Sequence, residues 1–191
     1  MSRTNAAAPL RVDVLTGLLP GARQVLSPQF DTRPPGAKPE LIVIHGISLP
    51  PGQFGGPWID RLFTGQLPAE AHEYFRQIAA LRVSSHVLIR RDGELVQYVP
   101  FGARAWHAGE SEYCGRKACN DFSIGIELEG VDDRPYEDVQ YERLAALVGA
   151  LLAAYPSLRR EDIVGHSDIA PGRKTDPGAA FDWTRFRKAI A

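Results

Sequence analysis

Apolar and polar positions follow two different periods along this chain, and each period predicts a different kind of element. Residues 41–45 (LIVIH) form a continuous β-branched run that ends in a histidine, which is typical of a buried strand. Residues 86–100 contain two alternating runs around an Asp-Gly pair, and this pattern predicts a β-hairpin. Residues 122–130 alternate again, and residues 162–166 (DIVGH) form a short strand that also ends in a histidine.

Helical spacing of apolar residues predicts three helices. Residues 68–82 carry apolar side chains at Ala71, Tyr74, Phe75, Ile78 and Leu81. Residues 136–155 form a long amphipathic stretch that stops before Pro156. Residues 181–191 form a terminal helix for which Asp182 is a plausible N-cap.

The order of these elements predicts an α/β fold. Strands and helices alternate irregularly around one clear hairpin, which favours a mixed β-sheet with helices packed on it. No repeat or linker divides residues 1–191, so we expect a single domain, with residues 1–9 flexible. Residues 46–58 form a long loop rich in Gly and Pro, and loops of that length are often functional.

Composition narrows the possible partners and the compartment. The formal charge is −1 and no long basic stretch occurs, so nucleic acid is a poor candidate partner. No stretch approaches eighteen apolar residues, and Asp13 interrupts the apolar part of the N-terminal segment, which argues against a membrane or an export signal. Two cysteines, with four residues between them, give neither a zinc finger nor a disulfide framework. We therefore expect a soluble cytoplasmic protein with no obligate protein partner.

Two of the five histidines end apolar strands, where side chains project into adjoining loops. His45 follows LIVI, His166 follows DIVG, and Asp176 lies ten residues after His166. A single histidine at a strand end is more often structural. Two imidazoles with one carboxylate, however, are a common ligand set for catalytic zinc, with the fourth position left for water. The spacing therefore makes His45, His166 and Asp176 a candidate ligand set for one Zn²⁺, with structural histidines as the alternative.

Two further charged residues would have a role beside such a metal. Glu127 shares one face of its strand with Ser123, Gly125 and Glu129. It could simply face water, or it could move the protons that amide hydrolysis requires. Lys174 could be an ordinary surface lysine, or its ammonium could stabilise the oxyanion of the tetrahedral intermediate.

The remaining histidines and the search for known catalytic motifs say less about the function. We interpret His72 as exposed and inert, and His86 as a residue of the core or one that supports the site. His107 follows Trp106 in a loop, where an aromatic ring either binds a sugar or peptide or anchors the loop. The chain contains no G-x-S-x-G, G-x-x-x-x-G-K-[ST], G-x-G-x-x-G or H-E-x-x-H, so serine-hydrolase, nucleotide-binding and common metalloprotease readings lack support.

Five segments together resemble a known family. They are VIHGISLPPGQFGGPWIDRLFTG, HVLIRRDGELVQYVPF, RAWHAGES, CNDFSIGIELEG and GHSDIAPGRKTDPG. The chain is similar over residues 20–187 to the zinc N-acetylmuramoyl-L-alanine amidases, a family that includes phage-lysozyme-type amidases and peptidoglycan recognition proteins. The similarity is to the cytoplasmic members that act on anhydromuropeptides.

The resemblance implies a mixed sheet flanked by helices and a zinc site on one face. It implies cleavage of the amide between the lactyl group of 1,6-anhydro-N-acetylmuramic acid and L-alanine, in muropeptide recycling. Matched positions imply His45, His166 and Asp176 as zinc ligands and Glu127 and Lys174 as the catalytic pair. They also imply substrate contacts at Arg82, Trp106, His107 and Ala108.

Two other functions are weighed against this one. A muropeptide-binding module without catalysis would lack part of the metal set, which is complete here. An exported amidase that cuts intact peptidoglycan would require a signal segment that the sequence lacks.

Overall fold

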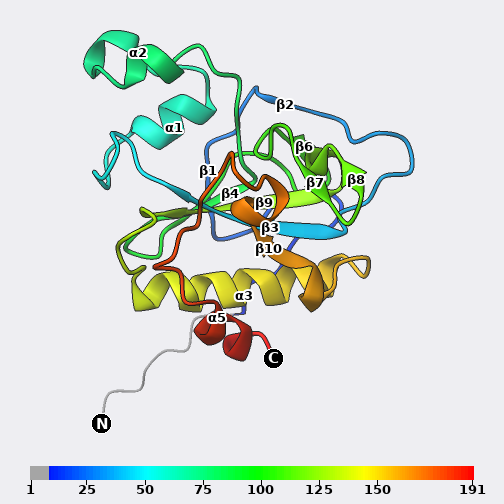
Figure 1. Ribbon diagram of the computed structural model, residues 1–191. Coiled ribbons are helices and arrows are strands. Elements are labelled where there is room, and N and C mark those ends of the chain that lie inside the picture. Colours follow the sequence, from blue (N-terminus) through cyan, green and yellow to red (C-terminus); the bar gives the residue numbers. More distant parts are fainter. Residues whose placement is uncertain (1–8) are drawn as a thin grey trace.

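A six-stranded mixed β-sheet forms the centre of the computed structural model, which describes residues 9–191 (Figure 1). The strand order is β1-β5-β4-β9-β3-β10, and all pairs are parallel except the antiparallel hairpin of β4 and β5. The strands are β1 (Arg23–Gln24), β3 (Leu41–Ile47), β4 (Val87–Ile89), β5 (Leu95–Gln97), β9 (Ser123–Glu129) and β10 (Ile163–Gly165). Two small antiparallel pairs lie outside it: β2 (Phe30–Asp31) with β6 (Arg104–Ala105), and β7 (Glu112–Tyr113) with β8 (Arg116–Lys117).

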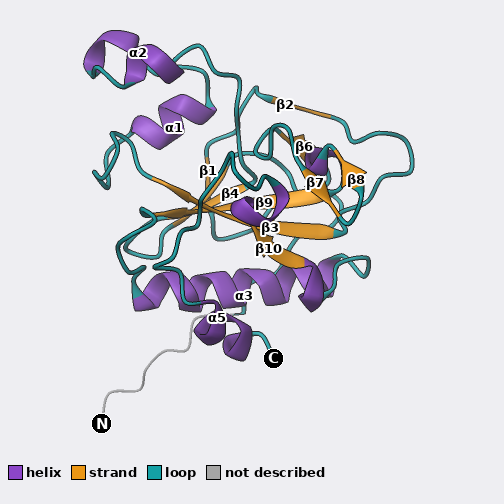
Figure 2. Ribbon diagram, in the orientation of Figure 1, coloured by secondary structure: helices purple, strands orange, loops and turns teal. Residues whose placement is uncertain are grey.

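Helices cover both faces of the sheet, as the resemblance implied (Figure 2). One face packs on α3 (Asp138–Ala154) and α5 (Trp183–Ala189). Beyond the other face lie α1 (Trp58–Phe63) and α2 (Phe75–Ile78), while α4 (His166–Ile169) directly follows β10. Short 3-10 turns complete the fold at Ala69–Ala71, Cys119–Asp121 and Arg160–Asp162. No helix within residues 9–191 combines the length and apolar character that crossing a lipid bilayer requires.

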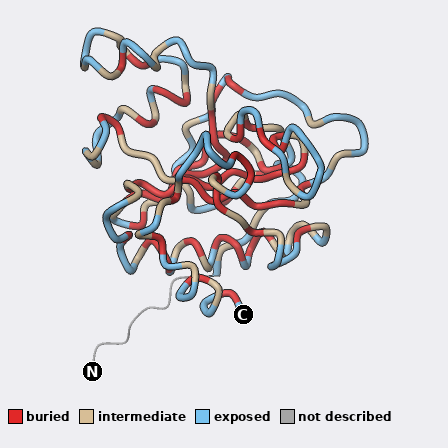
Figure 3. Tube along the Cα trace, in the orientation of Figure 1, coloured by how far each residue is buried: buried red, intermediate tan, exposed pale blue. Residues whose placement is uncertain are grey.

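The two longest strands, β3 and β9, are buried on both faces, and this burial makes the sheet a rigid platform (Figure 3). On β3, Ile42 and Ile44 face α3, and His45 lies on the opposite face with Leu41 and Val43. The parallel register pairs His45 with Glu127 on β9, so these two side chains project from the same face of neighbouring strands. The sheet alone therefore brings a predicted ligand and a predicted acid/base together.

Most of the predicted elements are confirmed. The β3 and β10 strands, the β4–β5 hairpin, β9 and α3 all lie within the ranges that the periodicity indicated, apart from a two-residue extension of β3 to Ile47. The side chain of Asp182 accepts a hydrogen bond from the Arg185 backbone N–H, which confirms it as the N-cap of α5. The expectation that residues 1–9 are flexible falls, apart from Pro9, outside the described residues.

The predicted helix over residues 68–82 is wrong. The segment forms one 3-10 turn and the four-residue α2, separated by His72 in an extended conformation. The Nδ1 atom of His72 accepts the backbone N–H of Tyr74, a local bond that competes with the helical one. His72 is half-buried rather than exposed, and Leu81, expected on the apolar face, is 48% exposed. In this segment the local hydrogen bond to His72 outweighs the helical spacing of the apolar residues.

His86 is a core residue that holds the middle of β9. Its Nδ1 atom accepts the Gly125 backbone N–H at 3.0 Å, and its Nε2–H donates to the Ala103 carbonyl at 3.2 Å. Complete burial, followed by the charge of Arg33, lowers the pKa of His86 to about 3. The ring is therefore neutral in the folded protein over the whole physiological range.

This burial predicts a dependence of stability on pH. Between pH 6.5 and 3 the unfolded chain binds a proton at His86 that the folded chain does not, so the free energy of unfolding falls as the pH falls. His86→Asn retains an acceptor for Gly125 but removes this titration. The stability advantage of the natural protein over the variant should therefore shrink below pH 6.5, by at most about 1.4 kcal/mol per pH unit. Urea unfolding of both proteins at pH 7 and pH 4.5 measures this stability advantage. An advantage of the same size at both pH values would contradict the low pKa of His86.

Candidate metal centre

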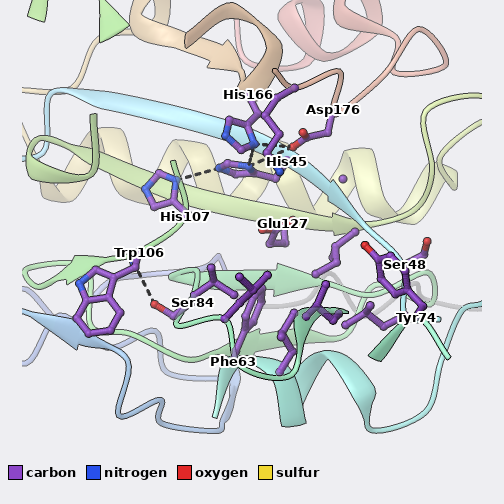
Figure 4. A pocket seen from close by; sticks show the side chains of 18 residues that line it. His45, Ser48, Phe63, Tyr74, Ser84, Trp106, His107, Glu127, His166 and Asp176 are labelled. Atoms are coloured by element: carbon purple, nitrogen blue, oxygen red, sulfur yellow. Dashed lines mark hydrogen bonds and ion pairs between the residues drawn. The ribbon is translucent and has the colours of Figure 1, made fainter. Parts of the chain in front are cut away.

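Three side chains converge on one point beside the central strand (Figure 4). The Nδ1 atoms of His45 and His166 are 3.0 Å apart, and they lie 3.2 and 3.1 Å from Oδ2 of Asp176. Both histidines are buried, with 2% and 3% of their surface exposed. A tetrahedral zinc with metal–nitrogen distances of about 2.0–2.1 Å separates its ligand atoms by about 3.3 Å. The observed triangle fits that geometry.

The chemistry of the three atoms also fits a cation. The opposite nitrogen of His166, Nε2, lies 3.2 Å from the Ala108 carbonyl, which can only accept, so the neutral ring carries its proton there. Its Nδ1 atom is then an unprotonated acceptor that faces the acceptor oxygen of Asp176. Lone pairs that face one another in a buried site need either a proton or a cation between them. Two imidazoles and one carboxylate form a ligand set that zinc commonly takes, so the three side chains are a candidate zinc site.

The surroundings hold the ligands in the protonation states that a metal requires. Burial is the main cause that lowers the pKa of His45 to about 4, so its ring is neutral near pH 7. Burial would raise the pKa of Asp176, but its contacts with His166 and then His45 outweigh that effect and hold the pKa below its usual range. The site therefore presents a neutral imidazole and an ionised carboxylate without further rearrangement.

The loop that returns from His166 to Asp176 is fixed at both ends. The Ser167 backbone N–H donates to the Asp176 carbonyl at 3.0 Å. The next carbonyl, that of Pro177, accepts the hydroxyl of Tyr136 at 2.9 Å. Gly46 makes room for this hydroxyl, because a Cβ atom at Gly46 would lie 2.5 Å from it. Asp176 is thus positioned by contacts on either side of it.

Glu127 and Lys174 lie beside the three converging side chains. Glu127 is buried and has no hydrogen-bond partner among the described residues, so its carboxyl group is available to a ligand. Burial, and secondarily the charge of Asp176, raises the pKa of Glu127 well above its usual range, while Lys174 opposes this shift. Lys174 is exposed and lines the same cavity as Glu127.

The three side chains open onto a cavity of about 280 Å³. One wall carries His45, Glu127 and His166, and the opposite wall comes from α1, α2 and the residues after them. Figure 4 shows Phe63, Tyr74 and Ser84 across the space from Glu127. A second cavity shares Trp106, His107, His166 and Lys174 with the first. The two adjoining cavities have room for an extended ligand that passes the candidate metal.

The residues predicted to contact substrate surround the second cavity, which is lined by Arg82, Trp106, His107 and Ala108 among others. The guanidinium of Arg82 lies 4.8 Å from the centre of the Trp106 ring, a cation–π contact. The ring of His107 points inward, with both nitrogens within hydrogen-bond distance of protein atoms. Nothing in this geometry tests substrate contact, and these assignments stay predictions.

Arg173 and Asn120 support the site through backbone groups. Arg173 donates from its guanidinium to the Ala108 carbonyl at 2.7 Å, and Asn120 accepts the backbone N–H groups of both His107 and Ala108. No periodicity identifies these two residues, because each acts through a loop carbonyl or amide. Ser123, which also supports the site, does carry a signal, because strand alternation already placed it on the face of Glu127.

The similarities of the chain agree with this geometry. Residues 35–179 match the family described as N-acetylmuramoyl-L-alanine amidase. The chain is 62% identical over 175 residues to the 1,6-anhydro-N-acetylmuramyl-L-alanine amidase AmpD of Escherichia coli K12, which covers 92% of this chain and 95% of that one. A crystal structure of selenomethionine AmpD superposes with a TM-score of 0.91 at 59% identity and covers 94% of this chain and 99% of that one.

A more distant structure carries a ligand. The amidase AmiD of Escherichia coli, in complex with anhydro-N-acetylmuramic acid-L-Ala-D-γ-Glu-L-Lys as substrate, superposes with a TM-score of 0.58 at 30% identity. The superposition covers 82% of this chain and 60% of that one.

The fold and the site together define an amidase with a candidate metal centre at the end of a mixed sheet. The chain belongs to the N-acetylmuramoyl-L-alanine amidase family, and it is an enzyme with that activity. Within the family its resemblance is to the AmpD-type enzymes, which confirms the relationship that the sequence motifs predicted.

The converging side chains predict the outcome of removing one of them. His45→Ala deletes one of three ligand atoms, and we expect the purified variant to hold much less than one zinc per chain by elemental analysis. His72→Ala, which alters a half-buried histidine outside the cluster, serves as the matched control and should retain the natural zinc content. A His45→Ala protein that still binds one zinc tightly would contradict the ligand assignment.

Proposed function

We propose that this protein is a zinc-dependent amidase of cell-wall muropeptide recycling. It hydrolyses the amide between the lactyl group of 1,6-anhydro-N-acetylmuramic acid and the L-alanine of the stem peptide. The observation that carries the proposal is the convergence of two Nδ1 atoms and one carboxylate oxygen within 3.2 Å, next to a buried, unpaired Glu127. The names of the AmpD relatives and the ligand of the AmiD complex support the choice of substrate.

The proposed metal is held by His45, His166 and Asp176. A bound zinc ion would supply Lewis acidity to the scissile carbonyl and acidify a water molecule. The three protein ligands leave room on the side of the cavity, where Glu127 and Lys174 lie. The chain's own residues then provide the remaining chemistry.

Glu127 is the proton carrier of the proposed reaction. Its carboxyl group takes the proton from the attacking water and returns it to the nitrogen of L-alanine as the amide bond breaks. Burial favours the protonated form of Glu127, which suits the step that delivers the proton to the leaving nitrogen. No hydrogen bond within residues 9–191 engages the carboxyl group, so both of its oxygens are available.

Lys174 supplies positive charge to the same cavity. It sits on the loop between His166 and Asp176, so the segment that carries two of the ligands also positions its ammonium group. In the proposed reaction this group stabilises the negative oxygen of the tetrahedral intermediate.

The second cavity accommodates the stem peptide in this proposal. Arg82 and Lys174 line it together with Arg104 and Arg173, and stem peptides carry carboxylates. The Trp106 ring lies between the two cavities, and its Nε1–H is buried without a hydrogen-bond partner among the described residues. Arg82, Trp106, His107 and Ala108 are the proposed substrate contacts.

The role of Glu127 predicts the effect of a conservative change. Glu127→Gln keeps the shape of the side chain but cannot carry the proton, so we expect an unchanged zinc content and a kcat lower by about 10²–10⁴-fold. Glu129→Gln is the matched control on the same face of the same strand. Its carboxylate binds Arg90 and the Gly55 backbone N–H, so this variant should lose stability rather than turnover. Loss of zinc from Glu127→Gln would show instead that Glu127 serves the metal.

The substrate class is tested by offering two substrates to the zinc-loaded enzyme. We expect release of free stem peptide from a soluble anhydromuropeptide and little from intact peptidoglycan sacculi. Cleavage of sacculi at a similar rate would contradict the recycling role while leaving the amidase chemistry intact. Tight binding without cleavage of either substrate would favour a muropeptide-binding module instead.

A further inference from the structure

A chain of hydrogen bonds leaves His45 on the side opposite the candidate metal. The Nε2 atom of His45 lies 2.9 Å from Nδ1 of His107. The Nε2 atom of His107 lies 3.1 Å from the hydroxyl of Ser123, and that hydroxyl lies 2.6 Å from the Cys119 carbonyl. The chain therefore runs from a ligand histidine through a second histidine to the backbone.

The backbone end sets the direction of every bond in this chain. The Cys119 carbonyl can only accept, so it takes the single hydroxyl proton of Ser123. The Ser123 oxygen can then only accept from Nε2–H of His107, which leaves Nδ1 of the neutral His107 ring unprotonated. That nitrogen accepts Nε2–H of His45, and Nδ1 of His45 is left with its lone pair directed at Asp176 and His166.

The same short segment also orients the other ligand histidine. Nε2–H of His166 donates to the carbonyl of Ala108, the residue after His107. The side-chain oxygen of Asn120 accepts the backbone N–H of His107 at 3.1 Å and that of Ala108 at 2.8 Å. Asn120 thus fixes the two residues that direct both imidazole ligands.

Strand β9 has a glycine at the point where the His107 ring lies against it. A Cβ atom on Gly125 would lie 2.5 Å from Cγ of His107, so the ring rests directly on the strand at the only kind of residue that permits it. Ser123 precedes this glycine by two positions on the same face and is fully buried. The ring of His107 is therefore confined between β9 and His45.

We propose that His107 is a positioning residue for the metal, and that residues 107–108 form one brace for both histidine ligands. By accepting Nε2–H of His45, His107 keeps the Nδ1 lone pair of that ligand aimed at the ion. This inference rests on the metal site of the proposed function. In this proposal both nitrogens of His107 bond to protein atoms, so only the face and the carbon edge of the ring can contact a ligand in the cavity.

Two substitutions at His107 separate hydrogen bonding from packing. His107→Leu and His107→Asn have side chains of the same branched shape, but only the asparagine offers an acceptor near the position of Nδ1. Chelator competition should show a zinc dissociation constant about 10–100-fold higher for His107→Leu than for the natural protein. His107→Asn should recover most of that loss, whereas equal weakening in both variants would overturn the proposal.

Variants of two serines extend the test to Ser123, which bonds to His107 and not to the proposed metal ligands. Ser123→Ala removes the acceptor of His107 and should weaken zinc binding in the same direction, by less than His107→Leu. Ser85→Ala is the matched control, because Ser85 is equally buried and its hydroxyl donates to the Gly125 carbonyl at 2.9 Å. Equal zinc affinities in the two serine variants would contradict the chain.

The hydrogen bond itself can be observed directly in the zinc-loaded, ¹⁵N-labelled protein. A scalar coupling across the bond between Nε2 of His45 and Nδ1 of His107 should be detectable, and it should vanish in His107→Leu. Absence of this coupling in the natural protein with zinc bound would overturn the proposal alone. Failure of the natural protein to bind zinc would instead overturn the proposed function, so the two failures are distinguishable.

Discussion

The site depends on the mutual approach of three electron-rich atoms at the edge of a cavity. The Nδ1 atoms of His45 and His166 and a carboxylate oxygen of Asp176 lie within 3.2 Å of one another. Such an arrangement requires a proton or a cation between the lone pairs, and the proposed function assigns that place to a metal ion. The surrounding contacts can be understood as the means of keeping these atoms together.

Several different contacts in the fold hold these three side chains in place. The parallel register of β3 and β9 fixes His45 beside Glu127, and the loop from His166 to Asp176 is tied to Tyr136 and to its own backbone. The segment at His107 and Ala108 meets both imidazoles from behind. Because these contacts come from segments far apart in the sequence, the candidate metal centre depends on the whole tertiary structure.

The sequence predicted the strands that carry the ligands, because β-branched runs and period-two alternation record burial directly. It also offered His45, His166 and Asp176 as one candidate set, and the structure brings these three side chains together. It failed over residues 68–82, where a bond from the Tyr74 amide to His72 overrides the apolar spacing. It could not identify Asn120 as a support or name the partner of Arg173, because their partners are backbone groups brought near by tertiary folding.

The central claim is that one zinc ion binds the two Nδ1 atoms and the Asp176 carboxylate. Anomalous diffraction at the zinc absorption edge, from crystals of the zinc-loaded protein, tests it most directly. The account predicts a single strong peak about 2.0–2.2 Å from Nδ1 of His45, Nδ1 of His166 and an oxygen of Asp176. A peak bound through either Nε2 atom, or a zinc ion elsewhere with these three side chains unliganded, would contradict it.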